Sequence, residues 1–263
     1  MKIPGGRGSG IMIFLRSFAI HSATLIYWVL FWLPFVPPMA FLPLFPPVRR
    51  HHIVRVLLLW FGLSMVKVVW RPFFRVHYRD DSQGFREPGI VVANHRAAND
   101  AFLVSLPRLS MAQTVNGWPL RLPVIGDVAR LAGYLDITNW DFSTLKERAG
   151  EVLAAGDMIV SYPEGTRSES RSMNPFHSGV FQLAQELKLP LYMLCIAGNE
   201  HMPDRKFRYR EFTKVSVRFL KPFTAEEVGG FASAYALKRA VFQRMAEELA
   251  AMDAELDRER NKS

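Results

Sequence analysis

The sequence predicts an α/β fold in which a mixed β-sheet is flanked by helices and preceded by an N-terminal membrane-embedded helix pair. Two observations lead to this prediction. Residues 17–47 form an apolar run without a formally charged side chain. After Arg71, short β-rich runs alternate with helix-like runs, which is the pattern of a sheet with helices packed on its faces. We therefore expect an N-terminal membrane-associated helical segment over residues 1–71 and a globular domain over residues 72–263.

The N-terminal block combines this apolar run with the positive charge of the chain. The 263 residues carry a net charge of +9, and residues 1–80 alone hold ten Lys or Arg against one acid, Asp80. Two stretches, about residues 11–33 and 53–70, have helical character and are separated by six prolines, which stop a helix. Basic residues set in an apolar run are typical of contact with anionic head groups rather than with nucleic acid. We expect an anionic membrane surface as a partner, and no nucleic acid.

Two arrangements in the membrane stay open for this block. Residues 11–33 are long enough to cross a bilayer, which needs roughly 20 apolar residues. Basic residues flank this stretch on both sides, so the positive-inside rule gives a single crossing no orientation. The same flanking charges suit a helix pair that dips into one leaflet, and Arg55 and Lys67 place residues 53–70 at the interface. The domain is expected on the cytoplasmic face of the membrane, the inner membrane in a bacterium.

Five strands and four helices are expected in the globular domain. The strands are expected at residues 73–77, 89–93, 158–162, 191–196 and 214–220. The helices are expected to start near Asp100, Thr144, Phe176 and Ser233. Thr144 and Glu147 have the spacing of a capping box, and Gly156 stands where that helix would end. The last helix carries an acidic face that we expect to be exposed to solvent, made of Asp253, Glu255, Asp257 and Glu259.

The first candidate for chemistry follows the expected strand 89–93. His95 falls on the turn, and Asp100 falls in the first turn of the helix behind it. This spacing lets the carboxylate reach back to the imidazole, which fixes the tautomer and strengthens the other ring nitrogen as a base. Such a dyad can take a proton from a hydroxyl as that hydroxyl attacks an acyl carbonyl.

The second candidate is the loop after the expected strand 158–162. Gly165 permits a left-handed backbone or a close approach, and Thr166 offers a hydroxyl. Arg167 presents a fork that matches an oxyanion, and Glu164 is placed to anchor Arg167 or another cation. The same residues also suit an ordinary turn closed by an Arg–Glu pair. Because both loops follow strands of one sheet, we expect them to share the crevice at its carboxyl edge.

Together these blocks resemble the membrane-bound glycerolipid acyltransferases typified by 1-acylglycerol-3-phosphate acyltransferase. The His95-x4-Asp100 block looks like the family's catalytic dyad, residues 162–168 resemble its third motif nearly letter for letter, and residues 122–126 fit the second. The similarity covers about residues 75–220. It implies that residues 72–263 are an acyltransferase catalytic domain in which His95 is the general base and Asp100 orients it. The substrate-binding residues that it implies are Glu164, Gly165, Thr166 and Arg167.

The resemblance also implies a reaction. A fatty acyl chain would move from acyl-CoA or acyl-carrier protein to the free hydroxyl of a lysophospholipid acceptor such as 1-acyl-glycerol-3-phosphate, in phospholipid biosynthesis or remodelling. No metal ion and no cofactor are expected, and no acyl-enzyme either, since no Ser or Cys is placed as a nucleophile. Two alternatives stay open. One is a membrane thioester or phosphoester hydrolase that uses the same base on water, and the other is a non-catalytic membrane scaffold of the same fold.

Two positions depart from the family's pattern. The second motif usually ends in an Arg that helps to hold the acceptor phosphate, where this chain has Asn139, and a Lys common at its start falls near Asn116. Outside the motifs, Cys195 lies in an apolar run and is expected to be buried. His51 and His52 are expected to be interfacial basic residues rather than metal ligands.

Overall fold

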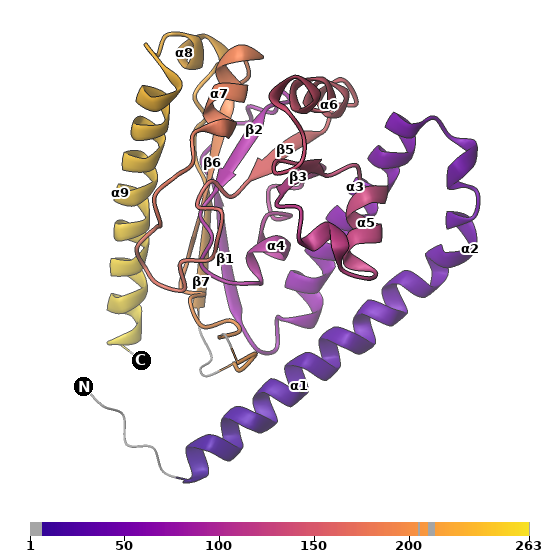
Figure 1. The fold of residues 1–263 in the computed structure, drawn as a ribbon. Coiled ribbons are helices and arrows are strands. Elements are labelled where there is room, and N and C mark those ends of the chain that lie inside the picture. The colour runs from indigo at the N-terminus through magenta and orange to yellow at the C-terminus, as the bar shows by residue number, and fades with distance from the viewer. Residues whose placement is uncertain (1–6, 205, 210–213, 263) are drawn as a thin grey trace.

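A seven-stranded sheet forms the centre of the computed structural model, which describes residues 7–204, 206–209 and 214–262 (Figure 1). The strand order is β1-β7-β6-β2-β5-β3-β4, and every neighbouring pair is parallel except β6 and β7. The prediction of a mixed α/β sheet with flanking helices is confirmed. The strands are β1 (Arg75–Asp80), β2 (Ile90–Ala93), β3 (Met111–Val115), β4 (Leu135–Asp136), β5 (Met158–Ser161), β6 (Leu191–Ala197) and β7 (Lys214–Phe219).

Helices cover both faces of this sheet, and the long helix α1 runs diagonally along the outside of the molecule (Figure 1). They are α1 (Arg7–Trp32), α2 (Val36–Met39), α3 (Pro47–Ser64), α4 (Asp100–Leu103), α5 (Ile125–Leu131), α6 (Phe142–Ala154), α7 (Gly179–Glu186), α8 (Ala225–Gly229) and α9 (Ala234–Arg260). Short helical turns complete the chain: η1 (Leu33–Phe35), η2 (Leu42–Leu44), η3 (Met65–Val69) and η4 (Pro119–Arg121). The stretches Gly10–Met39 and Pro47–Val69 are long and apolar enough to cross a membrane by length and composition alone.

The side chains of the central strands point alternately into two cores. On β2, Val91 and Ala93 pack toward α3, η3 and α4, whereas Ile90 and Val92 pack toward α6, α7 and α9. The first core includes apolar residues of α3 and η3 such as Phe61, so the N-terminal segment and the sheet share a core. The boundary between residues 1–71 and 72–263 stays a prediction about the chain, and residues on both sides of it contribute to this packing.

The expected helix starts are confirmed in part. The helix α4 begins at Asp100, and Ser233 caps α9 by accepting a hydrogen bond from the main-chain N–H of Ala236 at 3.2 Å. The capping box predicted at Thr144 is wrong, because Asp141 caps α6 and accepts from the main-chain N–H of Thr144 at 2.7 Å. The aspartate three residues earlier satisfies that amide, so the helix starts earlier than expected.

The end of α6 and the start of α7 complete this comparison. Gly156, at φ +79°, ends α6 as predicted. The helix expected near Phe176 starts later, at Gly179, because the main-chain N–H of His177 is held by the carbonyl of Pro163 at 2.8 Å.

Candidate active site

The two candidate loops lie side by side because β2 and β5 are adjacent parallel strands. Their register pairs Val92 with Ser161, so both strands end at the same edge of the sheet. The turn after β2 is fixed to a third strand, β6, by the buried side chain of Asn94. Its Nδ2 donates to the carbonyl of Ile196 at 2.9 Å, and its Oδ1 accepts from the N–H of Ile196 at 2.8 Å. The site therefore stands on three parallel central strands.

The structure brings His95 and Asp100 together as predicted. The distance from Nδ1 of His95 to Oδ2 of Asp100 is 2.8 Å. The Asp100 carboxylate is fully buried, and it also accepts from the N–H of Ala97 at 2.9 Å and from Nδ2 of Asn199 at 2.5 Å. When Nδ1 donates to this carboxylate, the lone pair of the ring is on Nε2. The His95 side chain is 23% exposed, so the ring remains accessible to a substrate.

A tyrosine supports the other side of this ring. The rings of His95 and Tyr162 stack with centroids 4.4 Å apart and an interplanar angle of 29°. Burial raises the pKa of the Tyr162 hydroxyl well above its usual value, so this group stays protonated. It has no hydrogen-bond partner among the residues that the structure describes. Tyr162 therefore acts as a flat platform that restricts the imidazole to one plane.

Sequence reasoning missed Asn199 and the platform role of Tyr162. Asn199 follows β6, which pairs in parallel with β2. The rule that located the first two loops, polar residues directly after neighbouring parallel strands, would have found it. The stacking of Tyr162 had no comparable signal, because an aromatic residue at the end of a strand is ordinary core composition.

Glu164 connects the two loops through the main chain rather than through Arg167. Its Oε1 accepts from the main-chain N–H of His95 and its Oε2 from that of Asn174, both at 2.7 Å. The N–H of Ser168 in turn donates to the carbonyl of His95 at 2.8 Å. Burial raises the pKa of Glu164, and these hydrogen bonds oppose the shift. The expectation that Glu164 anchors Arg167 is wrong, since both carboxylate oxygens already hold main-chain amides.

The tip of the second loop faces outward and carries Arg167, a cation without a partner in the described part of the chain. Gly165 adopts φ +70°, and a Cβ added there would lie 3.1 Å from Nε2 of His177, so glycine suits both the backbone and the space. Thr166 is exposed and Arg167 is half-buried. Within the described part of the chain, the guanidinium of Arg167 has no hydrogen bond or ion pair. The turn closed by an Arg–Glu pair is therefore not what forms here.

The side-chain amides of the two asparagines that depart from the family's pattern are both engaged in hydrogen bonds within the protein. Nδ2 of Asn116 donates to the carbonyl of Gly165 at 3.3 Å. Nδ2 of Asn139 donates to Oδ2 of Asp136 at 2.7 Å. Both amides therefore serve to hold loops, and neither position supplies a cation beside Arg167.

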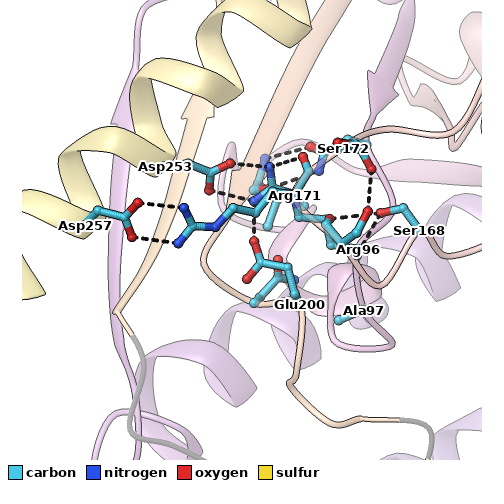
Figure 2. Close-up of polar contacts among 12 residues, drawn as sticks. Arg96, Ala97, Ser168, Arg171, Ser172, Glu200, Asp253 and Asp257 are labelled. Carbon is cyan, nitrogen blue, oxygen red and sulfur yellow. Dashed lines mark hydrogen bonds and ion pairs between the residues drawn. The ribbon is translucent and has the colours of Figure 1, made fainter. Parts of the chain in front are cut away.

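The acidic face of α9 is about half exposed to solvent at Glu255, Asp257 and Glu259, but Asp253 is buried, which corrects that part of the sequence-based expectation. Asp253 is 8% exposed and pairs with the fully buried Arg96, which follows His95 (Figure 2). Asp257 forms two hydrogen bonds with Arg171, each 2.7 Å long. The remaining two acids pair with cations of β7, Glu255 with Arg218 and Glu259 with Lys214. The long helix is thus tied to the sheet and to both loops by ion pairs that sequence spacing does not reveal.

The remaining candidates play structural parts. Cys195 is fully buried as expected, and burial raises the pKa of its thiol. His52 is more than an interfacial basic residue, because its Nδ1 lies 2.8 Å from the buried carboxylate of Asp157, which also binds Arg55 at 2.6 Å. His51 lines a cavity of about 400 Å³ beside α3 and α6. Among the described residues, no group of three or more His, Cys, Asp or Glu could hold a metal ion.

Comparisons with known proteins agree with the motifs. Residues 74–197 match the acyltransferase family, and this range contains both loops. The 1-acyl-sn-glycerol-3-phosphate acyltransferase of Limnanthes douglasii is 24% identical over 183 residues, covering 67% of this chain and 60% of that protein. The enzyme of the same name from Saccharomyces cerevisiae is 28% identical over 152 residues, covering 54% of this chain and 50% of that protein. The chain thus spans about half to three fifths of the length of these relatives.

A solved structure shows the same fold over nearly the whole chain. The crystal structure of the 1-acyl-sn-glycerophosphate acyltransferase PlsC from Thermotoga maritima matches with a TM-score of 0.70 and 18% identity. The match covers 93% of this chain and 97% of that one, so it includes the N-terminal helices as well as the sheet. The resemblance found in the sequence is confirmed.

Proposed function

The chain belongs to the acyltransferase family, and from that premise we propose that it transfers a fatty acyl group from a thioester donor to the free hydroxyl of a lysophospholipid. The observation that carries this proposal is the His95–Asp100 pair, 2.8 Å apart, with the imidazole accessible at the carboxyl edge of the sheet. Lysophosphatidate, 1-acyl-glycerol-3-phosphate, is the proposed acceptor, because the similar proteins from Limnanthes douglasii and Saccharomyces cerevisiae carry that substrate in their names.

In the proposed reaction, His95 is the catalytic base. Its Nε2 takes the proton of the acceptor hydroxyl as the oxygen attacks the thioester carbonyl. The tetrahedral intermediate then collapses, the C–S bond breaks, and the thiolate leaves with the proton returned from the imidazolium. Asp100 stabilises that imidazolium, and its contacts to Ala97 and Asn199 keep the carboxylate in place. The transfer is direct, since Cys195 is fully buried and offers no accessible nucleophile.

Arg167 is proposed to bind the phosphate of the acceptor. A half-buried guanidinium without a partner in the described structure is suited to a bidentate contact with an oxyanion. Thr166 would add its hydroxyl, and Gly165 allows a close approach of the main chain. Glu164 contributes by holding this loop against the turn of His95. The site residues are therefore divided into a proton-transferring pair and a phosphate-binding loop.

We further propose weaker head-group selection than the family's pattern implies. A phosphomonoester carries nearly two negative charges, and its recognition favours more than one cation. The two family cation positions are occupied by Asn116 and Asn139, whose amides are engaged with Gly165 and Asp136. Lysophosphatidate should be accepted, with less discrimination against lysolipids that have a phosphodiester head. Competition between two lysolipids in one reaction measures this ratio of kcat/KM directly.

The proposed location is the membrane, with the catalytic domain on the cytoplasmic face. Apolar side chains of α1 are widely exposed, among them Phe14 at 67% and Phe18 at 63%. Exposed apolar residues also lie in the chain around η4 and α5, including Trp118 at 65% and Ile125 at 57%. Such a surface is stable against lipid rather than water, and it would give the site access to substrates that reside in the bilayer.

One assay separates this proposal from its alternatives. The purified chain is incubated with lysophosphatidate and a radiolabelled acyl donor, either acyl-CoA or acyl-carrier protein, and labelled phosphatidate and free fatty acid are measured. Phosphatidate that forms only when acceptor and donor are both present supports the transferase. Free fatty acid released at the same rate without the acceptor would instead identify a hydrolase. Neither product with any donor, from protein that is folded, would identify a non-catalytic scaffold.

A further inference from the structure

Arg96 follows the proposed base, yet its side chain points away from the substrate into the protein. It is 1% exposed and is among the largest fully buried side chains of the described residues. Nη1 donates to Oε1 of Glu200 at 2.6 Å and to Oδ1 of Asp253 at 2.9 Å, and Nη2 donates to Oδ2 of Asp253 at 2.8 Å and to the carbonyl of Arg171 at 2.7 Å (Figure 2). A guanidinium so enclosed cannot touch a substrate, so its effect on the reaction must pass through its neighbours.

The partners of Arg96 connect the site to the C-terminal helix. Asp253 is on α9, which lies outside the region 74–197 that matches the acyltransferase family. Asp257, one helical turn further, holds Arg171 through two hydrogen bonds of 2.7 Å. Residues four apart lie on one face of a helix. One face of α9 therefore binds both Arg96, in the turn after His95, and Arg171, in the chain that continues from the phosphate-binding loop.

The contacts from α9 add to two others that hold the turn carrying His95. The main-chain N–H of His95 is fixed by Glu164, and its carbonyl is fixed by the N–H of Ser168. Both contacts come from the second loop. Arg96 adds a contact from a different element, α9, and the two oxygens of Asp253 fix the direction of its guanidinium.

We propose, on the basis of the proposed role of His95 as the base, that Arg96 and Asp253 form a positioning clamp that keeps the imidazole in its reactive place. Through Asp253, α9 then helps to position the base. A buried ion pair is weak evidence that the pair stabilises the fold, because apolar residues of similar volume in its place often give a fold that is equally stable or more stable. Unlike apolar residues, the ion pair fixes the direction of the Arg96 side chain and so the position of the turn that carries His95. Misplacement of a reacting group by about 1 Å can cost about 100-fold in rate.

The test compares the Tm, which reports the stability of the fold, with kcat, which reports the position of the base. The single variant Asp253→Leu leaves the Arg96 charge buried with fewer partners and should lower the Tm. The double variant Arg96→Met/Asp253→Leu removes the buried cation and its bidentate partner, and it should recover most of that loss, since the remaining partner, Glu200, is 14% exposed and can be solvated. Its kcat should nevertheless stay at least about tenfold below wild type, with KM for donor and acceptor within about twofold. Glu259→Gln is the matched control, because Glu259 lies on the same helix as Asp253 but forms an exposed ion pair with Lys214 of β7, and it should keep the wild-type kcat.

Two results would overturn the clamp. A double variant with a restored Tm and a wild-type kcat would show that the pair is only structural. If the double variant does not fold, Asp253→Asn is measured below its Tm, and a wild-type kcat there would have the same meaning. His95→Ala is assayed in parallel. If His95→Ala stays active, both the proposed base and the clamp are wrong. If His95→Ala is inactive and the double variant is fully active, only the clamp is wrong.

Discussion

Asp100 and Arg167 show two opposite uses of a charged side chain in this protein. A buried charge is costly unless its polar atoms are satisfied, and the oxygens of Asp100 accept from His95, Ala97 and Asn199. Such a group is held in one place and can orient the imidazole. The guanidinium of Arg167 is half-buried and has no partner within the described chain, so its donors are available to an anion. The satisfied charge is suited to hold the imidazole in place, and the unsatisfied charge is suited to bind an anion.

Arg167→Lys should raise the KM for lysophosphatidate by about tenfold or more, with or without a fall in kcat. A lysine places one point charge where the arginine offers two parallel donors, and a hydrogen bond to a charged group contributes about 1.5–3 kcal/mol. Initial rates over a range of acceptor and donor concentrations provide the measurement. Arg148→Lys, an exposed arginine paired with Glu151 on α6, should leave both KM values unchanged. Unchanged constants for Arg167→Lys would remove this residue from the acceptor site.

At the scale of elements, the sequence predicts best those strands that are buried on both faces. The strands β2, β5 and β6 read as continuous apolar runs because helices cover both sides of them, and all three were located. The missed strands carry weaker signals, since the outer half of β3 is only partly buried and β4 has two residues. The dyad was likewise readable, because its members are five residues apart. The pairing of Arg96 with Asp253 was not, because hydrophobic periodicity does not tell which acid of a helix meets a residue 157 positions away.

Asp141→Ala should lower the Tm at neutral pH, because it removes the N-cap of α6. The hydrogen bond from the main chain of Thr144 lowers the pKa of Asp141. A carboxyl group with a lowered pKa stabilises the fold above its ordinary pKa, roughly 3.9, and loses this effect as the pH falls through the lowered value. The difference in Tm between wild type and variant should therefore be full at pH 7 and shrink below about pH 4.

Glu147→Ala provides the comparison for this cap. Glu147 is exposed on α6 and would matter for the helix start only if Thr144 were the cap. Its replacement should leave the Tm close to wild type. A loss of Tm in Glu147→Ala as large as that in Asp141→Ala would contradict the helix start seen in the structure.

At the scale of the whole molecule, the two N-terminal helices have different surroundings. Little of the apolar window of α1 is buried, whereas α3 and η3 contribute Phe61, Met65 and Val66 to the core beneath the sheet. The long helix α1 runs along the outside of the molecule (Figure 1), and one side of it, including the fully buried Ile20, packs against the core. We infer that α1 supplies most of the membrane contact, while α3 connects it to the catalytic domain. The membrane contact of α1 can therefore be tested by replacing its exposed side chains, which leaves the core intact.

Replacing exposed apolar residues of α1 should release the protein from lipid without unfolding it. Phe14, Phe18 and Leu25 are each more than 60% exposed, so the triple change to Ser removes little packing. Flotation with vesicles that contain anionic phospholipid should fall strongly, and the Tm should change little. Activity should fall on lysolipid presented in vesicles and be retained on a short-chain, water-soluble acceptor. Tyr235→Ser, a change at an exposed aromatic residue of α9, is the control, and undiminished flotation of the triple variant would assign the contact to another surface.

The central claim is that His95, oriented by Asp100, removes the proton of the acceptor hydroxyl. The most direct measurement is the kcat/KM of His95→Ala with lysophosphatidate and an acyl thioester, beside its Tm and its flotation with vesicles. The predicted result is a loss of roughly 10²–10⁴ in rate with wild-type Tm and membrane binding, because general-base catalysis typically contributes that much. A variant that folds, binds vesicles and keeps more than about a tenth of the wild-type rate would contradict the assignment of the base.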